Sequence, residues 1–290
     1  MFGRVIAVVA CALVIVAAYA GLRVWQEQTA GTGPVATAAA PEGATREIAF
    51  IANSVGGTVS LLDVEARTVV GEIDVLPDGK KVGLFRDWEQ ATGGQAAGEA
   101  RGINYAQDTD VSPDGKVLYV ARGYIGDVAA FDIATGALMW RVPIGGNRAD
   151  HMTMTHDGKR LFVSALRANY VEAIDTATGK KAGKIVSGSW PHDNHMSADG
   201  TRLYNASIGD MTIPLAERDN VAEATDERGF AYQIMVVDPV SLQVLDRHRF
   251  DKGIRPIAIT DDESMLYAQQ SNQHWVIAYD LRAKEEVDRL

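Results

Sequence analysis

The sequence predicts an all-β fold, namely a β-propeller of four-stranded antiparallel blades, and three observations lead to this prediction. Beyond Glu47 a short turn sequence recurs with a period of 42 or 43 residues. Each repeat contains short segments rich in β-branched and aromatic residues, with glycine-containing turns between them. No stretch after residue 47 has the helical period that a stack of helical repeats would require. Four short strands in a repeat of this length are typical of propeller blades.

Two turn signatures set the phase of the repeat. The first is an Asp-Gly turn, and it occurs at residues 112–116, 155–159 and 197–201, with a weaker copy at residues 260–264. The second is a Thr-Gly turn, and it occurs at residues 132–136 and 175–179, with weaker copies at residues 63–66 and 238–241. Glycine suits both turns because it adopts positive φ without steric cost. The longer interval before the last Asp-Gly turn indicates an insertion.

One repeat carries a resemblance to a known family. Residues 112–145 read SPDGKVLYVARGYIGDVAAFDIATGALMWRVPIG. This run resembles the YVTN-type β-propeller repeat, which is related to surface-layer, lactonase-like and haem d1-domain propellers. The resemblance covers roughly residues 47–290, and it implies blades of four antiparallel strands, often seven of them. It is specific to the style of repeat and not to a function.

The number of repeats is smaller than the resemblance implies. Units begin near residues 47, 106, 150, 192 and 255, so about five repeats are visible. We expect the first unit to lack an inner strand and the last to reach its outer strand at Leu290. A seven-bladed ring would need about two more repeats, so we expect a ring that is truncated at its C-terminus. The alternative is a partner that completes the ring, because an open sheet edge would promote aggregation.

Residues 1–25 form an apolar segment. Eighteen uncharged residues, 5–22, lie between Arg4 and Arg23. This length is close to the minimum for a membrane-spanning helix and slightly long for the apolar part of a signal peptide. Residues 18–20 read Ala-Tyr-Ala, which fits a cleavage site. The segment is therefore predicted to be a signal peptide or an N-terminal transmembrane anchor, and both alternatives send the rest of the chain across a membrane.

The rest of the domain organisation follows from composition. Residues 26–46 run through Thr, Gly, Ala and Pro with almost no large apolar residue, which is typical of a flexible linker. Residues 47–290 hold the repeats and form the incomplete propeller. We therefore expect a periplasmic or extracellular protein that is either secreted or anchored in the membrane through its N-terminal segment.

Charge and cysteine content exclude some classes of function. The net charge is −10 with a pI of about 5.1, and no block of Lys and Arg occurs, so a nucleic acid partner is not expected. The single cysteine, Cys11, lies in the leading apolar segment. The repeats therefore contain no disulfide, no cysteine metal ligand and no cysteine nucleophile.

The phase of the repeat also predicts which face of the propeller binds a ligand. We name the strands of a blade A to D from the axis outward. The Asp-Gly turns then join A to B and the Thr-Gly turns join C to D, so both lie on one face. Two long insertions, residues 76–105 and 208–230, join D to A and B to C and therefore lie on the other face. Long loops in a compact domain are often functional, so we expect a ligand or protein partner there.

Polar residues gather where the predicted inner strands begin, on the face with the insertions. Alignment on the Asp-Gly turns places the predicted ligand-binding residues at the mouth of the central channel: Asp108, Asp110, Asp150, His151, His192, Asp193, His195 and Arg255. A divalent metal such as zinc, iron or copper would suit imidazole and carboxylate groups, and the candidate ligands are His151, His192, His195 and Asp193. The alternative is that these side chains cap strand ends and bond to backbone. The other histidines are expected to be structural or on the surface: His156, His248 and His274.

No sequence motif indicates catalysis, so the question of enzyme activity stays open. The chain contains no G-x-S-x-G, no H-E-x-x-H and no Cys-x-x-Cys-His motif. The first hypothesis is an extracytoplasmic propeller that binds a protein or small-molecule partner or acts as a scaffold. The alternative, which the lactonase-like and haem d1-like resemblance implies, is an enzyme or redox protein with a metal or haem-like cofactor at the mouth. His151, His192 or His195 would then be an axial ligand.

Overall fold

The computed structural model describes residues 46–79, 104–210, 232–271 and 273–290. They all belong to the second of the two units into which the chain divides, residues 38–290. The predicted N-terminal segment and all but the last residue of the predicted linker lie outside the described residues. So do residues 80–103, within the first predicted insertion, and residues 211–231, which include most of the second. Within the part of the chain that the structure describes, no helix is long and apolar enough to cross a membrane.

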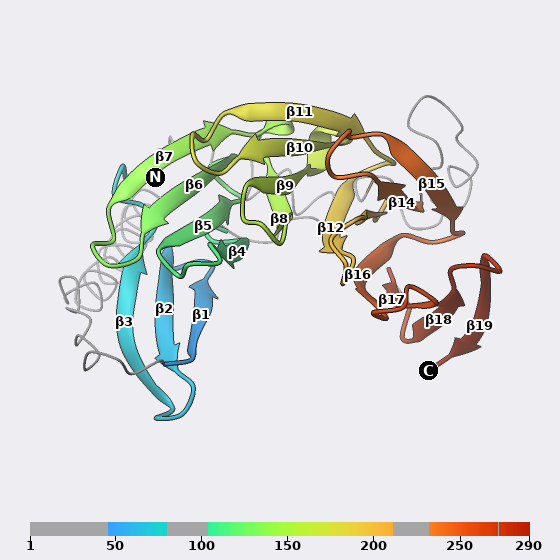
Figure 1. The fold of residues 1–290 in the computed structure, drawn as a ribbon, viewed down its shortest axis with the longest axis horizontal. Helices are drawn as coiled ribbons and strands as arrows, with labels where there is room; N and C mark the ends of the chain where they lie inside the picture. Colours follow the sequence, from blue (N-terminus) through green and yellow to red (C-terminus); the bar gives the residue numbers. More distant parts are fainter. Residues whose placement is uncertain (1–45, 80–103, 211–231, 272) are drawn as a thin grey trace, which may run out of the picture. The chain divides into compact units, whose positions relative to one another are not determined.

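Five antiparallel sheets follow one another along the described chain, each a meander of neighbouring strands (Figure 1). Blade 1 consists of β1 (Ile48–Asn53), β2 (Thr58–Asp63) and β3 (Thr68–Asp74), and blade 2 of β4 (Asp108–Val111), β5 (Val117–Arg122), β6 (Asp127–Asp132) and β7 (Leu138–Pro143). Blade 3 consists of β8 (Ala149–Met154), β9 (Arg160–Ala165), β10 (Tyr170–Asp175) and β11 (Lys181–Val186). Blade 4 consists of β12 (Pro191–Met196), β13 (Leu203–Ser207), β14 (Gln233–Val237) and β15 (Val244–Arg249). Blade 5 consists of β16 (Ile254–Ile259), β17 (Met265–Gln270), β18 (Val276–Asp280) and β19 (Glu285–Arg289).

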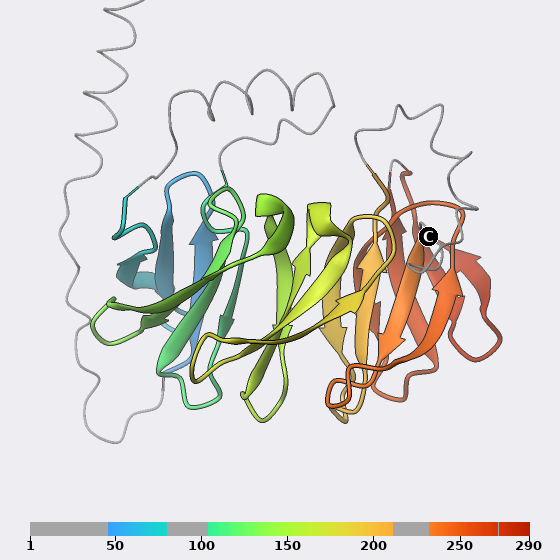
Figure 2. The same ribbon diagram turned by 90° about the horizontal axis from the view of Figure 1, so that it is seen from above.

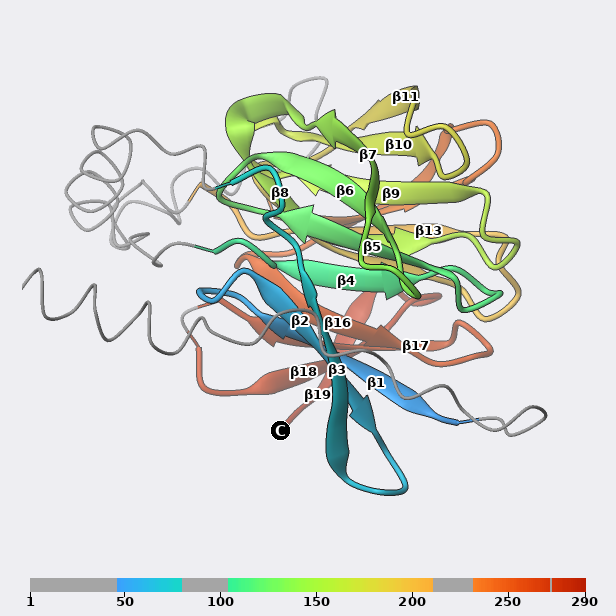
Figure 3. The same ribbon diagram turned by 90° about the vertical axis from the view of Figure 1, so that its left-hand side faces the viewer.

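The first strand of each four-stranded blade lies innermost. β4, β8, β12 and β16 contact one another in this order, and β1 also contacts β4. β4 runs toward the end of the blade where the tight turns lie, and β5 returns from it (Figure 3). In side view the tight turns lie together along the lower edge of the blades (Figure 2). The prediction of an all-β propeller with four-stranded antiparallel blades is thus confirmed.

Blade 1 has three strands in the described part of the chain. The turn at residues 63–66 joins β2 to β3, as the Thr-Gly turns join the third and fourth strands of the other blades. Strands β1 to β3 therefore hold the second to fourth places of a blade, which agrees with the expectation that the first unit lacks an inner strand. The number of blades in the full ring and its truncation stay predictions.

The hydrophobic core lies between neighbouring blades. In β5, Leu118 packs toward blade 1 and the next residue, Tyr119, packs toward blade 3. In the same way, Leu203 of β13 packs toward blade 3 and Tyr204 packs toward blade 5. The middle strands are buried on both faces because a blade has a neighbour on each side, and every residue of β13 and β14 is buried. This burial explains why the middle strands lack the alternation of apolar and polar residues that a strand with one exposed face would show.

The Asp-Gly turns are held by their own side chains. In blade 3, the carboxylate of Asp157 accepts hydrogen bonds from the Thr155 hydroxyl at 2.7 Å and from the Lys159 amide at 3.1 Å. Gly158 has a φ of 72°, which disfavours any residue with a Cβ. The bond from Thr155, and then that from Lys159, lowers the pKa of Asp157 to about 2. A further copy of the second turn type, which the sequence pattern missed, lies at residues 280–284 between β18 and β19.

Candidate ligand site at the ends of the inner strands

The inner strands of blades 2, 3 and 4 begin on the face opposite the tight turns, and residues at their starts come together. We call this group the inner-strand site, and it consists of Gln107, Asp108, Asp150, His151, His192 and Asp193. Gln107 precedes β4 and Asp108 begins it, Asp150 and His151 lie near the start of β8, and His192 and Asp193 lie near the start of β12. Because these three strands lie side by side, residues about 40 positions apart in the sequence meet here.

Two aspartates of the site brace one blade against the next. Asp108 Oδ2 accepts a hydrogen bond at 2.9 Å from the amide of Met152, which lies in the next inner strand. Asp193 Oδ2 accepts the equivalent bond at 2.8 Å from the Ile257 amide. In both residues Oδ1 accepts a bond from the following amide of the same strand, at 2.9 and 3.0 Å. The capping interpretation therefore describes Asp108 and Asp193 well.

Blade 3 departs from this pattern because His151 holds the position of the bracing aspartate. In place of the missing carboxylate, Asn194 on the neighbouring strand β12 bonds the two blades. The amide group of Asn194 donates to the His151 carbonyl oxygen at 2.8 Å and to the Ser164 hydroxyl at 2.9 Å. The backbone between blades 3 and 4 is thus bonded without the imidazole of His151. That ring is left for interactions inside the site.

His151 lies between two carboxylates. Its Nδ1 is 3.3 Å from Asp108 Oδ2, and its Nε2 is 3.9 Å from Asp150 Oδ1. The side-chain nitrogen of Gln107 is 3.4 Å from the same Nε2. Burial lowers the pKa of His151, but the hydrogen bond to Asp108 and the negative charges of Asp150, Asp108 and Asp193 outweigh it, so the pKa lies above its ordinary value.

The orientation of the Gln107 side chain is fixed from its other end. Its oxygen accepts a hydrogen bond from Arg148 Nη2 at 2.9 Å and another from the side-chain nitrogen of Asn104. The amide nitrogen of Gln107 must therefore face His151. Since Gln107 donates toward Nε2 and Asp108 accepts from Nδ1, the contacts favour the tautomer of His151 with its proton on Nδ1 and a lone pair on Nε2.

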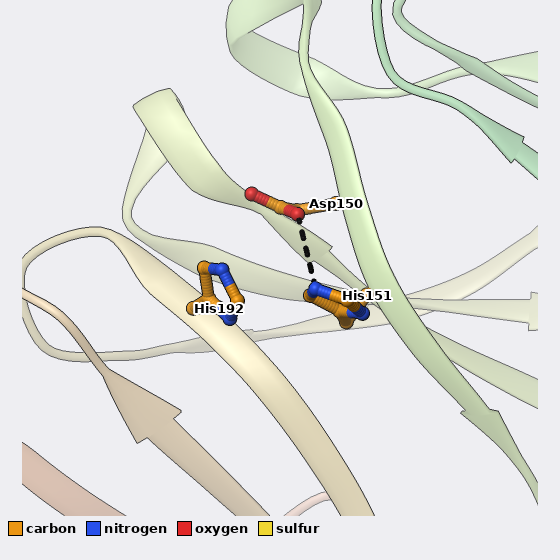
Figure 4. Close-up of side chains that lie close together, drawn as sticks. All are labelled: Asp150, His151 and His192. Atoms are coloured by element: carbon orange, nitrogen blue, oxygen red, sulfur yellow. Dashed lines mark ion pairs between the residues drawn. The ribbon is translucent and has the colours of Figure 1, made fainter. Parts of the chain in front are cut away.

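His192 packs against His151 from the next blade. The ring centroids are 4.5 Å apart and the planes are tilted by 42° (Figure 4). Its Nδ1 is buried and has no hydrogen-bond partner among the described residues. Burial first, and then the charges of His151, Arg255 and Arg148, hold the pKa of His192 well below its ordinary value. His192 is therefore a neutral imidazole at neutral pH.

One group of potential metal ligands occurs in the described ranges, and it consists of Asp150, His151 and His192. One ligand atom from each lies within 4.8 Å of the others. The sequence had suggested His151 and His192 together with His195 and Asp193, and the structure brings Asp150 to them instead. Successive residues of a strand point to opposite sides. Asp193 accordingly bonds to blade 5 while His192 packs on blade 3.

The remaining predicted residues lie around the site. Asp110 lies two residues further along β4 and accepts a hydrogen bond from the Val111 amide at 2.9 Å. Burial, with a contribution from the charge of Asp108, raises the pKa of Asp110 to about 6. Burial likewise raises the pKa of Asp193. His195 lies on β12 outside the group of three, and Arg255 on β16 acts on His192 through its charge.

The histidines expected outside the site lie away from it. His156 is exposed in the Asp-Gly turn of blade 3, and His274 is exposed as well. His248 lies on β15, is only 3% exposed, and packs edge-on against Tyr279 with 5.6 Å between the ring centroids. These positions agree with a surface or structural role.

Sequence reasoning missed a buried ion-pair network on the same face. Arg122 is completely buried, and its Nε and Nη2 donate to the two carboxylate oxygens of Asp127 at 2.7 and 2.6 Å. Its Nη1 donates to the Val75 carbonyl at 3.0 Å and to Asp78 at 2.9 Å. Blade 1 is thereby tied to blade 2. The available signal was a charged residue at the end of the apolar run of β5.

A second buried network, also missed, lies beside the site between blades 3 and 4. Asn205 is fully buried and accepts a hydrogen bond from the Ser187 hydroxyl at 2.5 Å. Its side-chain nitrogen donates to the Ser164 hydroxyl at 3.1 Å and to the Asp193 carbonyl at 3.1 Å. These bonds satisfy polar groups that would otherwise be costly to bury, and they fix the backbone beneath the site.

Comparison with known proteins agrees with the fold. The family described as outer membrane protein assembly factor BamB matches residues 56–202, half of the chain. The chain belongs to this family. The matched region runs from blade 1 into blade 4 and includes His151, His192 and Asp193. No match was found among curated proteins.

Among solved structures, this BamB-like chain is similar to hydrazine synthase of Kuenenia stuttgartiensis. The TM-score is 0.60 and the sequence identity is 19%. The similarity covers 83% of this chain and 62% of that chain, so the BamB-like chain spans somewhat less than two thirds of the length of its structural relative. At this identity the likeness shows the propeller fold alone.

Proposed function

We propose that this BamB-like protein is an extracytoplasmic binding propeller that recognises a protein partner at the face carrying the 76–105 and 208–230 insertions. One observation carries the proposal. The described residues of this face bring imidazole, carboxylate and guanidinium groups together from blades 2, 3 and 4, whereas the opposite face consists of repeated tight turns. A surface whose groups do not follow the repeat is where a specific partner finds complementary chemistry.

The family supports this reading. The family is described as outer membrane protein assembly factor BamB, a name that refers to the assembly of other proteins at the outer membrane. We infer the same general class of role here, with export or anchoring through residues 1–25. The repeats themselves, with their DGK-x-LYV and DxATG runs, are inferred to be of the YVTN type.

Cross-linking from matched positions tests the proposed face. Arg167 is exposed in the η3 turn (Leu166–Ala168) of blade 3, on the insertion face, and Lys159 is exposed in the Asp-Gly turn at the other end of the same blade. A photo-cross-linking residue at position 167 should give a discrete protein adduct in intact cells, and one at position 159 should not. Equal adducts from both positions, or none from position 167, would contradict a partner surface on this face.

The location is tested separately. A reporter fused after residue 45, which is active only outside the cytoplasm, should be active in cells. Deletion of residues 1–25 is the control and should abolish that activity. A fusion with residues 1–25 intact that stays in the cytoplasm would contradict export.

A second candidate function is favoured by the group Asp150, His151 and His192. It is an enzyme or redox protein with a metal or haem-like cofactor at the inner-strand site. Two imidazoles and a carboxylate are a ligand set that transition metals use in catalytic sites. The cofactor would then be bound by residues that the first candidate uses for partner recognition. Cross-linking from position 167 separates the two candidates, because only the first requires a protein partner at this face.

A further inference from the structure

We propose that Asp150, His151 and His192 bind a divalent transition-metal ion, such as Zn²⁺, between blades 3 and 4. The inference deepens the proposed function and rests on it for the location of the ligand. One ligand atom from each side chain lies within 4.8 Å of the other two, and the three groups face a common space (Figure 4). Ligands of a tetrahedral zinc ion lie about 2.0–2.2 Å from the metal, so small side-chain movements complete the site.

The contacts of His151 are those of a metal ligand. Metal-binding histidines commonly donate their second ring N–H to a carboxylate, which fixes the tautomer and the ring. Nδ1 of His151 faces Asp108 Oδ2 at 3.3 Å, and Asp108 is itself held by the Met152 amide at 2.9 Å. Nε2 then carries its lone pair on the side where Asp150 and His192 lie, and the metal ion would replace the Gln107 amide, now 3.4 Å away, as its partner. Asp108 is accordingly a positioning residue and not a ligand.

His192 shows why the site favours an ion. Its Nδ1 is buried without a hydrogen-bond partner among the described residues. A buried polar atom without a partner costs about 1–3 kcal/mol. A ring contact with His151 at 4.5 Å between centroids does not satisfy a ring nitrogen, whereas reorientation toward a shared metal does. The two imidazoles come from different blades, so the ion would also join them.

The charged groups around the two imidazoles favour the binding of a cation. The charged groups that act on the two imidazoles are three carboxylates and two guanidinium groups, namely Asp108, Asp150, Asp193, Arg148 and Arg255. With both imidazoles neutral the group has a net negative charge. The mixed nitrogen and oxygen ligand set selects a first-row transition metal over Ca²⁺ or Mg²⁺, which prefer oxygen ligands.

Three protein ligands leave one position open. Structural zinc sites have four protein ligands, while catalytic sites keep a position for water or substrate. The ion at this site would therefore present an exchangeable position to whatever binds the face. Two imidazoles with one carboxylate are also the ligand set of non-haem Fe²⁺ sites, so Fe²⁺ is the second ion to test.

Metal titration of the full-length chain in mild detergent tests the site without any partner. After removal of metals with EDTA, Zn²⁺ is titrated by calorimetry and Co²⁺ by visible absorption. We expect one ion per chain and loss of more than about 100-fold in affinity in His192→Ala and Asp150→Asn, since loss of an outer partner alone costs about 10–100-fold. Asp108→Asn keeps an acceptor for the Met152 amide and should lose about tenfold.

The matched controls are His195→Ala, on the same strand as His192, and His156→Ala, in the turn of the same blade as His151. Both should bind one ion with unchanged affinity. Melting curves with and without Zn²⁺ guard against misfolding, because a folded variant that lacks the site unfolds cooperatively and shows no metal-dependent rise. If His192→Ala fails to fold, His192→Asn replaces it.

The proposal is overturned if the chain binds no ion in stoichiometric amount, if His192→Ala binds as tightly as the parent, or if His195→Ala loses the ion instead. If no ion binds, a protonated His151 would be the cation that lies between the carboxylates of Asp108 and Asp150. Metal binding is measured without a partner, and cross-linking from position 167 is measured in cells. Each hypothesis therefore fails by its own experiment.

Discussion

The two ends of the inner strands use the same residue type in opposite ways. At the tight turns, Asp157 takes its hydrogen bonds from groups within two residues, and these bonds lower its pKa to about 2. At the other end, Asp108 and Asp193 bond across to the next blade, and burial raises the pKa of Asp193. The first environment is made by the local sequence and the second by packing of blades.

The difference shows where a repeat protein has freedom to vary. Each tight turn must close a hairpin, so its aspartate recurs in four blades with the same bonds. The start of an inner strand must bond to the next blade, but a side chain of either blade can supply that bond. Where Asn194 supplies it, His151 is released for a ligand. The chemistry thus gathers at the end that the repeat constrains least.

The largest expected effect is at the insertion face, in Arg122→Ala. The guanidinium is fully buried and bonds to Asp127 and Asp78, so its loss leaves these two carboxylates with only the partly exposed Arg141 as a cation. Removing one partner of a buried pair costs about 3–5 kcal/mol, and urea denaturation should show a loss of that size. The matched control on the turn face is Lys116→Ala, whose exposed ion pair with Asp114 is screened by solvent, so its loss should leave the stability nearly unchanged. A loss below about 1 kcal/mol in Arg122→Ala would refute the comparison.

An intermediate effect is expected for Asp110→Asn, and its sign depends on pH. The pKa of Asp110 is raised from 3.8 to about 6 in the folded chain. Between these values the folded state keeps a proton that the unfolded state loses, so stability falls as the pH rises from about 4 to 6. Asparagine removes this penalty, which we estimate at about 1–2 kcal/mol for a half-buried group. Denaturation midpoints of variant and parent should therefore diverge in favour of the variant between pH 4 and 7. An unchanged difference across this range would contradict burial of the carboxylate.

The smallest effect is expected at the turn face, in Asp157→Ala. The carboxylate is exposed and bonds only to Thr155 and Lys159, so the melting temperature should fall by a few degrees at most. Because its pKa is lowered from 3.8 to about 2, its contribution is present above pH 4 and is lost as the pH falls through 2. Asp157→Ala should thus become indistinguishable from the parent in acid. A large loss at neutral pH would show that the turn does more than close a hairpin.

The sequence predicted the place of the candidate site in the fold, but it did not predict which side chains meet there. Alignment on the Asp-Gly turns placed His151 and His192 at equivalent strand ends, and the structure brings their rings together. The metal ligands predicted with them were Asp193 and His195, whereas the structure brings Asp150 to the two histidines. That choice depends on the side of the strand to which each residue points, which varies with the irregular pairing near the starts of β8 and β12.

The sequence by itself determined the propeller, the phase of its blades and the face that carries the site. These follow from local patterns, because turn chemistry and apolar runs repeat with a fixed period. Only the tertiary structure decided that Asp108 and Asp193 brace neighbouring blades, that Arg122 is buried among carboxylates, and that His192 lacks a hydrogen-bond partner at Nδ1 among the described residues. These contacts join residues from different blades, and their energies depend on burial, which a linear pattern does not contain.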